Sequence, residues 1–148
     1  MIVQTTRFGG LEVNEGRIIT FAKGLLGFPQ HRRYALIHPN DGGFFFWLQA
    51  IDAPDLAFVV TDPQLFVPDY RVPLRPDQMQ EMGLSSMGEA QVLVIVNKRG
   101  SVLTGNLQGP LVIQTAGRLG EQLVLTDRRF HTRVPLVDLT AAVKTASA

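Results

Sequence analysis

The sequence predicts a mostly β fold, a small antiparallel β-barrel or sandwich that contains one short helix. Two observations favour it: segments rich in β-branched and aromatic residues recur at short intervals, and residues that favour turns separate them. The predicted strands are 2–6, 17–21, 34–38, 44–49, 57–61, 92–98, 102–107, 111–115 and 122–126. Many short strands at regular spacing are typical of sandwiches and small barrels.

Turn-forming residues mark where the early predicted strands end. Gly9 and Gly10 follow the first strand, and the segments 14–16, 39–43 and 52–55 are rich in Gly, Asn, Asp or Pro. Glycine and asparagine tolerate positive φ, and proline fixes φ, so these residues allow the chain to reverse direction. We therefore expect short strands joined by tight turns.

One segment, residues 76–83, departs from the β pattern. It begins with Pro76, has Asp77 in its first turn and ends at Gly83. Proline is favoured at the first helical position because its missing N–H would have no partner there, and glycine commonly ends a helix. The sequence predicts one short helix here.

The best-supported pairing in the sequence is a hairpin over residues 92–107. Its two apolar runs are joined by 97–101, a short loop that contains Gly100. The stretch 91–96 is apolar at nearly every position, which indicates a strand buried on both faces. We expect this strand to lie in the middle of the fold.

Length and composition favour one domain, residues 1–136, followed by a C-terminal tail, residues 137–148. A chain of 148 residues, 45% of them hydrophobic, fits a single core. In the tail, Leu139, Ala142 and Val143 would share one face of a helix capped by Asp138. Because so short a helix is unstable alone, we expect the tail to be either disordered or helical against a partner.

Composition and charge exclude several classes of protein. The absence of cysteine rules out disulfides, a thiolate nucleophile and zinc sites built on cysteine. The formal net charge is +1, and the 14 basic and 13 acidic residues are scattered, which disfavours direct nucleic-acid binding. Neither a signal-peptide pattern nor an apolar run of membrane-spanning length is present, so we expect a cytoplasmic protein with no membrane contact.

The sequence contains no catalytic, cofactor-binding or metal-binding motif. The three histidines, His31, His38 and His131, do not have the spacing of metal ligands on a helix. The serines lie in predicted turns or in the tail, without a neighbouring base. The Gly-x-x-Gly at 24–27 lacks the flanking helices of a KH module, so we interpret it as a turn. We expect no enzymatic activity and no cofactor.

Two apolar segments are candidates for a binding surface. In the run Phe44 to Trp47, strand alternation sends side chains to opposite faces, so we expect at least two in the core and the others, if exposed, in an apolar patch. The segment Phe66 to Tyr70 lies in a Pro-punctuated loop and either plugs the core or supplies an exposed anchor. With no clustered Lys or Arg nearby, protein is the favoured partner.

Several motifs, taken in order, make the chain resemble the FliW family of bacterial flagellar assembly factors. They are Gly24-Leu25-Leu26-Gly27-Phe28, Trp47-Leu48-Gln49, Leu56-Ala57-Phe58-Val59-Val60-Thr61-Asp62-Pro63 followed by Phe66 and Pro68-Asp69-Tyr70, Leu93-Val94-Ile95-Val96, Thr104 with Asn106-Leu107, Gly109-Pro110-Leu111-Val112-Ile113, Thr132-Arg133 and Pro135-Leu136. The resemblance runs from the first predicted strand to about residue 136. It depends on the order of the motifs, since no single one is specific enough.

The resemblance implies a small β-barrel-like protein that binds newly made flagellin in the cytoplasm. When free, it would bind the translational regulator CsrA and antagonise it allosterically, which relieves repression of flagellin translation. We expect it to act as a monomer, without a cofactor. The residues expected to contribute to or support the binding surface are Phe66, Pro68, Asp69, Tyr70, Phe130 and Arg133. We also expect Tyr70→Ala to weaken flagellin binding without unfolding the protein.

Two other classes of function stay open. An OB-like barrel would bind single-stranded nucleic acid by stacking bases on the aromatics of 44–47, with a steep dependence on salt. A small hydrolase would need Asp62 or Asp69 beside a histidine in a pocket, and nothing in the spacing predicts that arrangement.

Overall fold

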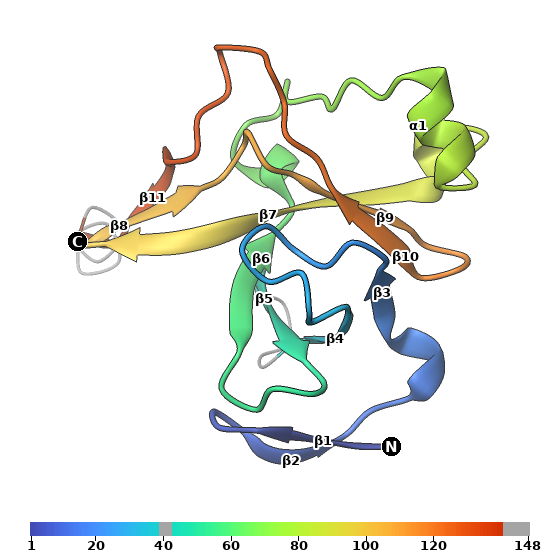
Figure 1. Cartoon of the computed structure of the whole chain (residues 1–148). Coiled ribbons are helices and arrows are strands. Elements are labelled where there is room, and N and C mark those ends of the chain that lie inside the picture. The colour runs from blue at the N-terminus through green and yellow to red at the C-terminus, as the bar shows by residue number, and fades with distance from the viewer. Residues whose placement is uncertain (39–42, 141–148) are drawn as a thin grey trace.

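The computed structural model describes residues 1–38 and 43–140. It is mostly β, with short strands, tight turns and a single α-helix among the described residues (Figure 1). The strands are β1 (Ile2–Thr5), β2 (Gly9–Glu12), β3 (Ile19–Phe21), β4 (Arg33–Ile37), β5 (Phe45–Ala50), β6 (Ala57–Thr61), β7 (Ala90–Arg99), β8 (Val102–Gly105), β9 (Leu111–Gln114), β10 (Leu119–Gln122) and β11 (Val134–Asp138). The helical elements are the 3-10 helices η1 (Glu15–Arg17), η2 (Pro63–Leu65) and η3 (Met87–Glu89), and the α-helix α1 (Pro76–Glu81). The predicted fold class is confirmed.

Most strands form one sheet that curls back on itself. Its order is β11-β8-β7-β6-β5-β4-β3-β10-β9, and β9 also pairs with β7, so the pairings return to their start. The ring can form because the two halves of β7 have different partners: 90–93 pair with β9 and 96–99 pair with β8. In Figure 1, β8 and β11 lie along one end of β7, and β9 and β10 along the other. The result is a barrel-like ring with a two-stranded extension.

One pairing in the ring, between β10 and β3, is parallel, whereas the predicted fold is antiparallel throughout. It covers only two residue pairs, Leu119 with Thr20 and Gly120 with Phe21. β10 reaches this place as the second strand of an antiparallel hairpin with β9, and its direction is therefore fixed before it meets β3. The short parallel contact closes the ring.

The predicted hairpin over 92–107 is present as β7 and β8, and β7 is the central strand. Asn97 lies opposite Thr104, and Gly100 supplies a φ of 60° in the turn. Leu93 and Val94 are both buried but belong to different hydrophobic clusters. Neighbouring residues of a strand face opposite sides, so β7 separates two cores. This arrangement is the physical basis of its nearly continuous apolar sequence.

Two hydrophobic clusters fill the molecule. The first lies inside the ring and contains Ile19, Phe21, Leu25, Tyr34, Leu48, Ala50, Val60, Leu93, Leu111 and Ile113. The second lies on the other side of β7, beneath α1 and the loops around it, and contains Tyr70, Val72, Met82, Leu84, Val94, Leu107, Val112, Leu123 and Leu125. The long loop after η2 thus has a core of its own beneath it.

The helix α1 forms where the sequence predicts it. Pro76 is its first residue, and the Arg75 N–H donates to the Gln78 side-chain oxygen at 2.9 Å, which satisfies one amide at the helix start. Gly83, with a φ of 71°, follows the C-terminal end. Among the described residues no helix has the length and apolar character needed to cross a membrane.

The N-terminal hairpin of β1 and β2 is a separate two-stranded sheet, seen below the ring in Figure 1. Gly9 and Gly10 belong to β2, whereas the sequence predicts only a turn there. Gly9 has a φ of 70° and lies opposite Thr5, so it ends the turn and begins the strand. The hairpin is joined to the ring by the Thr6 N–H, which donates to the Pro54 carbonyl at 2.8 Å, and by Phe8 against Trp47.

The predicted strand 122–126 is wrong in position, since β10 ends at Gln122. Leu123 and Leu125 are buried in alternation, which mimics a strand in the sequence. Each N–H of this pair makes an isolated backbone bond, to the carbonyls of Pro110 (2.9 Å) and Gln108 (2.8 Å), and no ladder forms. Alternating burial therefore marks a segment that covers the second cluster.

The strand β11 is not among the predicted strands, and it continues to Asp138, past the predicted domain end at residue 136. It pairs only with β8, and its register shifts between Pro135 and Val137. Proline is tolerated on an edge strand because the outer N–H needs no partner. The Asp138 carboxylate accepts a hydrogen bond from the Thr140 N–H at 3.0 Å, and the rest of the predicted tail helix lies outside the described residues.

Replacing Tyr34 by phenylalanine is expected to raise the free energy of unfolding by about 1 kcal/mol, because an unpaired buried polar group is costly. The Tyr34 side chain is buried in the first cluster, and its hydroxyl has no hydrogen-bond partner among the described residues. Phenylalanine keeps the packing against Phe21, whose ring lies 5.7 Å away, edge to face. Urea denaturation of both proteins measures the difference, and a clear loss of stability in the variant would contradict the assignment.

The buried Tyr34 hydroxyl is also expected to make the folded protein less stable at alkaline pH. Burial, with a smaller contribution from Asp52, raises the pKa of Tyr34 to about 12 from its ordinary value of 10.0. The unfolded chain therefore loses this proton at lower pH than the folded chain. The free energy of unfolding therefore declines as the pH rises from 10 to 12, because in this range the unfolded chain is stabilised by ionisation of the hydroxyl and the folded chain is not. Tyr34→Phe should remove this part of the decline in a pH series of urea denaturation curves.

Candidate functional site

The segment after β6 forms a compact loop that carries most of the predicted binding residues. Asp62 accepts a hydrogen bond from the Gln64 N–H at 2.9 Å, which caps η2. The Phe66 N–H then donates to the carbonyl of the first η2 residue at 3.1 Å, and the chain turns outward. Pro68 and Asp69 are exposed at this turn. Local sequence thus builds the loop: an aspartate cap, a proline at the helix start and a second proline at the tip.

Tyr70 anchors this loop to the body of the protein. Its side chain is buried, and its hydroxyl donates to the Leu107 carbonyl at 2.7 Å. Burial raises the pKa of the hydroxyl, which stays protonated at neutral pH. The Tyr70 ring also packs edge to face against Phe130 at a centroid distance of 5.0 Å. This contact holds the 66–70 loop beside the segment 127–133, which is far away in the sequence.

The segment 127–133 has an ion pair near its start. The Arg129 guanidinium donates to the Asp127 carboxylate at 2.7 Å and lies over the Phe130 ring, 5.5 Å from its centroid. Hydrogen bonds from Arg129 lower the pKa of Asp127, and the same bonds raise the pKa of Arg129. The Asp69 carboxylate adds a smaller upward contribution to the pKa of Arg129 across the gap between the two segments. The exposed acid and base are therefore electrostatic neighbours.

On its other side the loop contacts the start of β5. The rings of Phe45 and Phe66 are stacked with centroids 5.8 Å apart, and Phe44 meets Phe66 edge to face at 6.5 Å. We call Phe44, Phe45 and Phe66 the aromatic patch. The pairing of Phe45 with Thr61 explains the contact, because it places the beginning of β5 beside the loop that follows β6. Phe44 is 56% exposed, so the patch reaches solvent.

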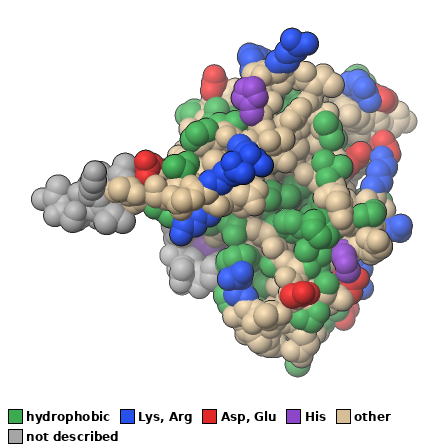
Figure 2. Space-filling view, turned by 60° about the vertical axis from the view of Figure 1, so that its left-hand side comes forward, with side chains coloured by type: hydrophobic (Ala, Val, Ile, Leu, Met, Phe, Trp, Pro, Cys, Tyr) green, Lys and Arg blue, Asp and Glu red, His purple; other side chains and the backbone are tan. Residues whose placement is uncertain are grey.

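Hydrophobic side chains gather on one face of the molecule. Figure 2 shows them in the hollowed middle of the face turned to the viewer, with Lys and Arg side chains near them. Large exposed hydrophobic residues among the described ones include Leu65 beside the aromatic patch, at 52% exposure. Contiguous apolar surface of this kind commonly marks a site of interaction with another protein.

Comparison with known proteins identifies the family. The family described as FliW protein matches residues 2–136. The chain belongs to the FliW family. A flagellar assembly factor FliW from Geotalea uraniireducens is 38% identical over 140 residues, which are 93% of this chain and 85% of that protein. One from Leptospira interrogans serovar Lai is 36% identical over 143 residues, which are 94% of this chain and 95% of that protein.

A solved structure of the family has the same fold. The crystal structure of the flagellar assembly factor FliW superposes with a TM-score of 0.84 at 28% sequence identity, over 93% of this chain and 97% of that one. The resemblance found in the sequence is therefore confirmed, and curated members of the family carry the name flagellar assembly factor.

The residues predicted for the FliW binding surface differ in how far they are exposed. Tyr70 and Phe130 are brought into contact, and Tyr70 is buried, so it supports the surface from beneath and does not reach a partner. Pro68, Asp69 and Arg133 are exposed. Phe66 is half-buried and faces the aromatic patch. Because the Tyr70 side chain is part of the second cluster, we expect Tyr70→Ala to lower the stability of the fold as well as to disturb the surface.

In the sequence, the run 44–47 and the 66–70 loop are separate candidates, and no local pattern indicates the aromatic patch that joins them. The patch could have been found only from the register of the two strands. Predicted strands 44–49 and 57–61 are antiparallel neighbours, so the start of the first lies beside the end of the second and the loop that follows it. None of Phe44, Phe45, Phe46 and Trp47 is fully buried, in contrast to the expectation of at least two in the core. Phe46 packs against the first cluster from its edge.

The aromatic run is poorly arranged for binding bases. The Arg7 guanidinium lies over the Trp47 ring at 4.0 Å from its centroid, and the Phe45 face is stacked on Phe66. Base stacking needs open ring faces beside a basic groove. Two of these four rings already have a partner on one face, so the geometry gives the OB-like alternative no support.

The described part of the chain contains neither the acid and histidine pair expected of a hydrolase nor a cluster of metal ligands. Asp62 lines two cavities, of about 370 and 440 Å³, and the residues described around them include no histidine. His31 pairs with Asp52 at 3.0 Å on the surface, outside both cavities. Among the described residues no cluster of three or more His, Asp or Glu has metal-binding geometry. The hydrolase alternative therefore lacks the acid and histidine pair on which it depends.

Proposed function

We propose that this chain binds flagellin in the cytoplasm and, when free of flagellin, binds CsrA and antagonises it allosterically. Flagellin made in excess would occupy the protein, and its export would release the protein to relieve repression of flagellin translation. The observation that carries this proposal is the family match over residues 2–136, with relatives named flagellar assembly factors. The exposed apolar face and the lack of a catalytic arrangement in the described residues agree with a protein that acts by binding.

The proposed binding surface is the 66–70 loop together with the segment 127–133. It has the usual anatomy of an interface, in which aromatic side chains are surrounded by polar and charged ones. Phe66 and Phe130 are the half-buried aromatics, and Pro68, Asp69 and Arg133 are the exposed residues around them. Because the Tyr70 and Phe130 contact fixes the two segments side by side, a partner would meet them as one surface.

Binding of purified flagellin and CsrA from the same organism tests the proposal. Isothermal titration calorimetry should detect each complex, and added flagellin should reduce the amount of CsrA recovered in a pull-down. If the chain binds neither protein, the proposed function is wrong. Binding of both without competition would remove the switch and leave two independent interactions.

Asp69→Lys is expected to weaken flagellin binding about tenfold, which corresponds to about 1.4 kcal/mol. The change replaces a negative charge on the exposed rim by a positive one. The new charge would repel Arg129, whose pKa is raised by the Asp69 carboxylate in the wild type. Asp55→Lys, an exposed aspartate in the turn between β5 and β6, is the matched control and should bind normally. Equal affinities for the two variants, with unchanged circular dichroism, would exclude this surface.

A further inference from the structure

Backbone hydrogen bonds show that β8 and β9 lie along the same edge of β7. The Ile95 carbonyl accepts the N–H of Asn106, which follows β8, at 2.9 Å, and the Glu89 carbonyl accepts the N–H of Thr115, which follows β9, at 3.1 Å. Both acceptors are odd-numbered residues, and in an antiparallel strand the backbone groups of alternate residues point to opposite edges. The even-numbered residues of β7 therefore point to the other edge, where β6 lies.

β6 covers only part of this other edge. Its last residues lie opposite 94–96, and the chain then leaves β7. It leaves because Asp62 caps η2, and Pro63, the first residue of η2, has no N–H that could continue the pairing. Residues 90–93 pair with β9 on the opposite edge and with no second strand among the described residues. β7 therefore has an open edge over residues 90–93.

Two backbone groups on this open edge are available to a partner. Ala90 and Val92 are the even-numbered residues here, so their backbone groups point to the open edge. The Ala90 N–H donates to the Met87 carbonyl of η3, and the Val92 carbonyl accepts the Gln91 side-chain amide at 3.3 Å. The Ala90 carbonyl and the Val92 N–H bond no group in the described part of the chain. One residue of a neighbouring extended segment can bond both.

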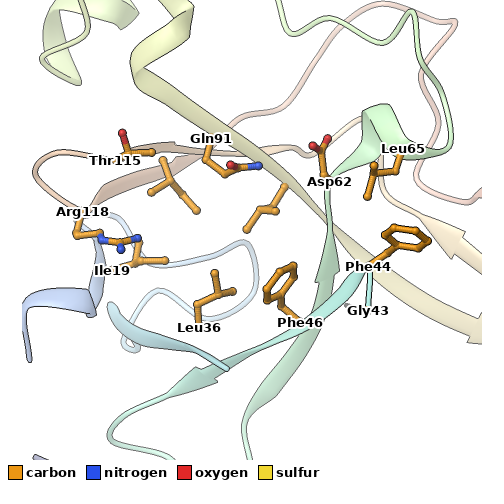
Figure 3. Close-up of a pocket in the computed structure, with 12 residues that line it drawn as sticks. Ile19, Leu36, Gly43, Phe44, Phe46, Asp62, Leu65, Gln91, Thr115 and Arg118 are labelled. Atoms are coloured by element: carbon orange, nitrogen blue, oxygen red, sulfur yellow. The ribbon is translucent and has the colours of Figure 1, made fainter. Parts of the chain in front are cut away.

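A cavity lies on each face of the sheet beside this edge. The cavity of about 370 Å³, which we call the groove, is on the side of the first cluster, and Leu93 of that cluster lines it. The cavity of about 440 Å³, which we call the side cavity, is on the side of the second cluster and is lined by Tyr70 and Val72. Gln91 and Asp62 line both cavities, and Figure 3 shows these two side chains at the groove. The open edge therefore runs between the two cavities.

The edge and its two cavities fit an extended peptide segment better than a helix. A segment bonded to β7 would send alternate side chains to the two faces of the sheet, and so into the groove and the side cavity. Main-chain bonds combined with pockets for alternate side chains are how proteins bind peptides by strand addition. The backbone groups of a helix are bonded within the helix, so a helix would leave the Ala90 carbonyl and the Val92 N–H unpaired. Apolar side chains line most of the groove, with Phe44 of the aromatic patch at its rim.

We infer that an extended segment of flagellin binds to the open edge of β7 as an added strand, with one of its residues opposite Gln91. The N–H of that residue donates to the Ala90 carbonyl, and its carbonyl accepts the Val92 N–H. Its side chain is apolar and enters the groove, and the side chains on either side of it enter the side cavity. The inference rests on the proposed function for the identity of the partner: Tyr70 of the 66–70 loop lines the side cavity, so flagellin bound to the proposed surface adjoins the edge.

Amide hydrogen exchange measured by NMR tests the edge without any substitution. In the free protein the Val92 amide should exchange rapidly, whereas the Leu93 amide, which faces β9, should be protected. Saturation with flagellin should slow the exchange of the Val92 amide at least tenfold. A protected Val92 amide in the free protein would overturn the open edge, and an unchanged rate in the flagellin complex would overturn the site. Protection by CsrA and not by flagellin would overturn the assignment of the partner.

Val92→Pro tests the same bond by removing the N–H that points to the open edge. Proline is tolerated where the N–H of a strand has no partner, so circular dichroism should show a folded protein. Calorimetry should show flagellin binding weakened at least tenfold. Gln4→Pro is the matched control: Met1 and Val13 bond each other across β1 and β2, so the N–H of Gln4 points to the outer edge of the hairpin. This control should bind flagellin as the wild type does.

The outcomes separate this inference from the proposed function. If wild-type protein does not bind flagellin, the proposed function fails, and the inference that rests on it fails too. If wild-type protein binds flagellin and a folded Val92→Pro variant binds it equally well, the edge is excluded while the proposed function stands. If Val92→Pro does not fold, the exchange of the Val92 amide in the wild-type complex decides. Weaker binding by Val92→Pro but not by Gln4→Pro, with a Val92 amide that flagellin protects, supports the site.

Discussion

Replacing Tyr70 by alanine is expected to lower the free energy of unfolding by about 3–5 kcal/mol, the usual cost of removing a buried aromatic side chain. The Tyr70 side chain is 2% exposed, packs against Phe130 and donates a hydrogen bond to the Leu107 carbonyl at 2.7 Å. Alanine would leave a cavity and an unpaired carbonyl, and it would separate the 66–70 loop from the segment 127–133. Urea denaturation monitored by circular dichroism measures the loss.

Tyr70→Phe is the matched control, because it removes only the hydroxyl. It should cost about 1–2 kcal/mol, the penalty for leaving a buried hydrogen-bond partner unsatisfied. A cost for Tyr70→Ala no larger than that for Tyr70→Phe would show that the ring is not part of the core. Weaker flagellin binding by Tyr70→Ala would then reflect a disturbed surface and not a lost contact with the partner.

Replacing Gly24 by alanine is expected to destabilise the fold by about 3 kcal/mol or more, because backbone strain and overpacking add together. Gly24 has a φ of 66°, and a Cβ there would lie 2.6 Å from the Phe28 carbonyl oxygen and 2.7 Å from the Pro29 Cα. Both are backbone atoms, which cannot rotate away as the end of a side chain can. Thermal and urea denaturation would measure the change.

Gly27→Ala provides the comparison for Gly24. Gly27 also has a positive φ, 85°, but a Cβ there would meet no atom within 4 Å. Only the backbone strain remains, about 1 kcal/mol for a left-handed residue that is not glycine. If the two variants lost equal stability, the nearby backbone atoms of Phe28 and Pro29 would not be the reason that position 24 requires glycine. The pair separates the two physical roles of glycine within one short motif.

The family motif around Gln49 also has a structural reason. Gln49 is buried, and its side-chain amide lies 3.1 Å from the carbonyls of both Ala53 and Leu56 in the turn between β5 and β6. Buried turn carbonyls need donors, and this amide provides one for Ala53 and adds a second for Leu56, whose carbonyl also accepts the Ala50 N–H at 3.0 Å. This family motif thus contributes to the stability of a turn.

Local patterns in the sequence were sufficient for elements whose stability is local. The helix at Pro76 follows from its first-turn proline and its terminating glycine, and the hairpin of β7 and β8 follows from two apolar runs and Gly100. The family, too, was evident from the order of short motifs. Burial of β7 on both faces was visible in its apolar run, because a strand between two cores has no polar face.

Long-range pairing decided the rest. Closure of the ring depends on a parallel contact between β10 and β3, and the Tyr70 hydroxyl finds its partner in a carbonyl 37 residues away, so neither has a signature in its own segment. For the candidate site, the sequence named most of the loop residues, but only the register of β5 against β6 brought Phe45 onto Phe66 and placed Phe44 on the rim of the groove. Which apolar side chains face solvent is set by what the ring has already covered. That depends on all the strands at once, and local sequence does not encode it.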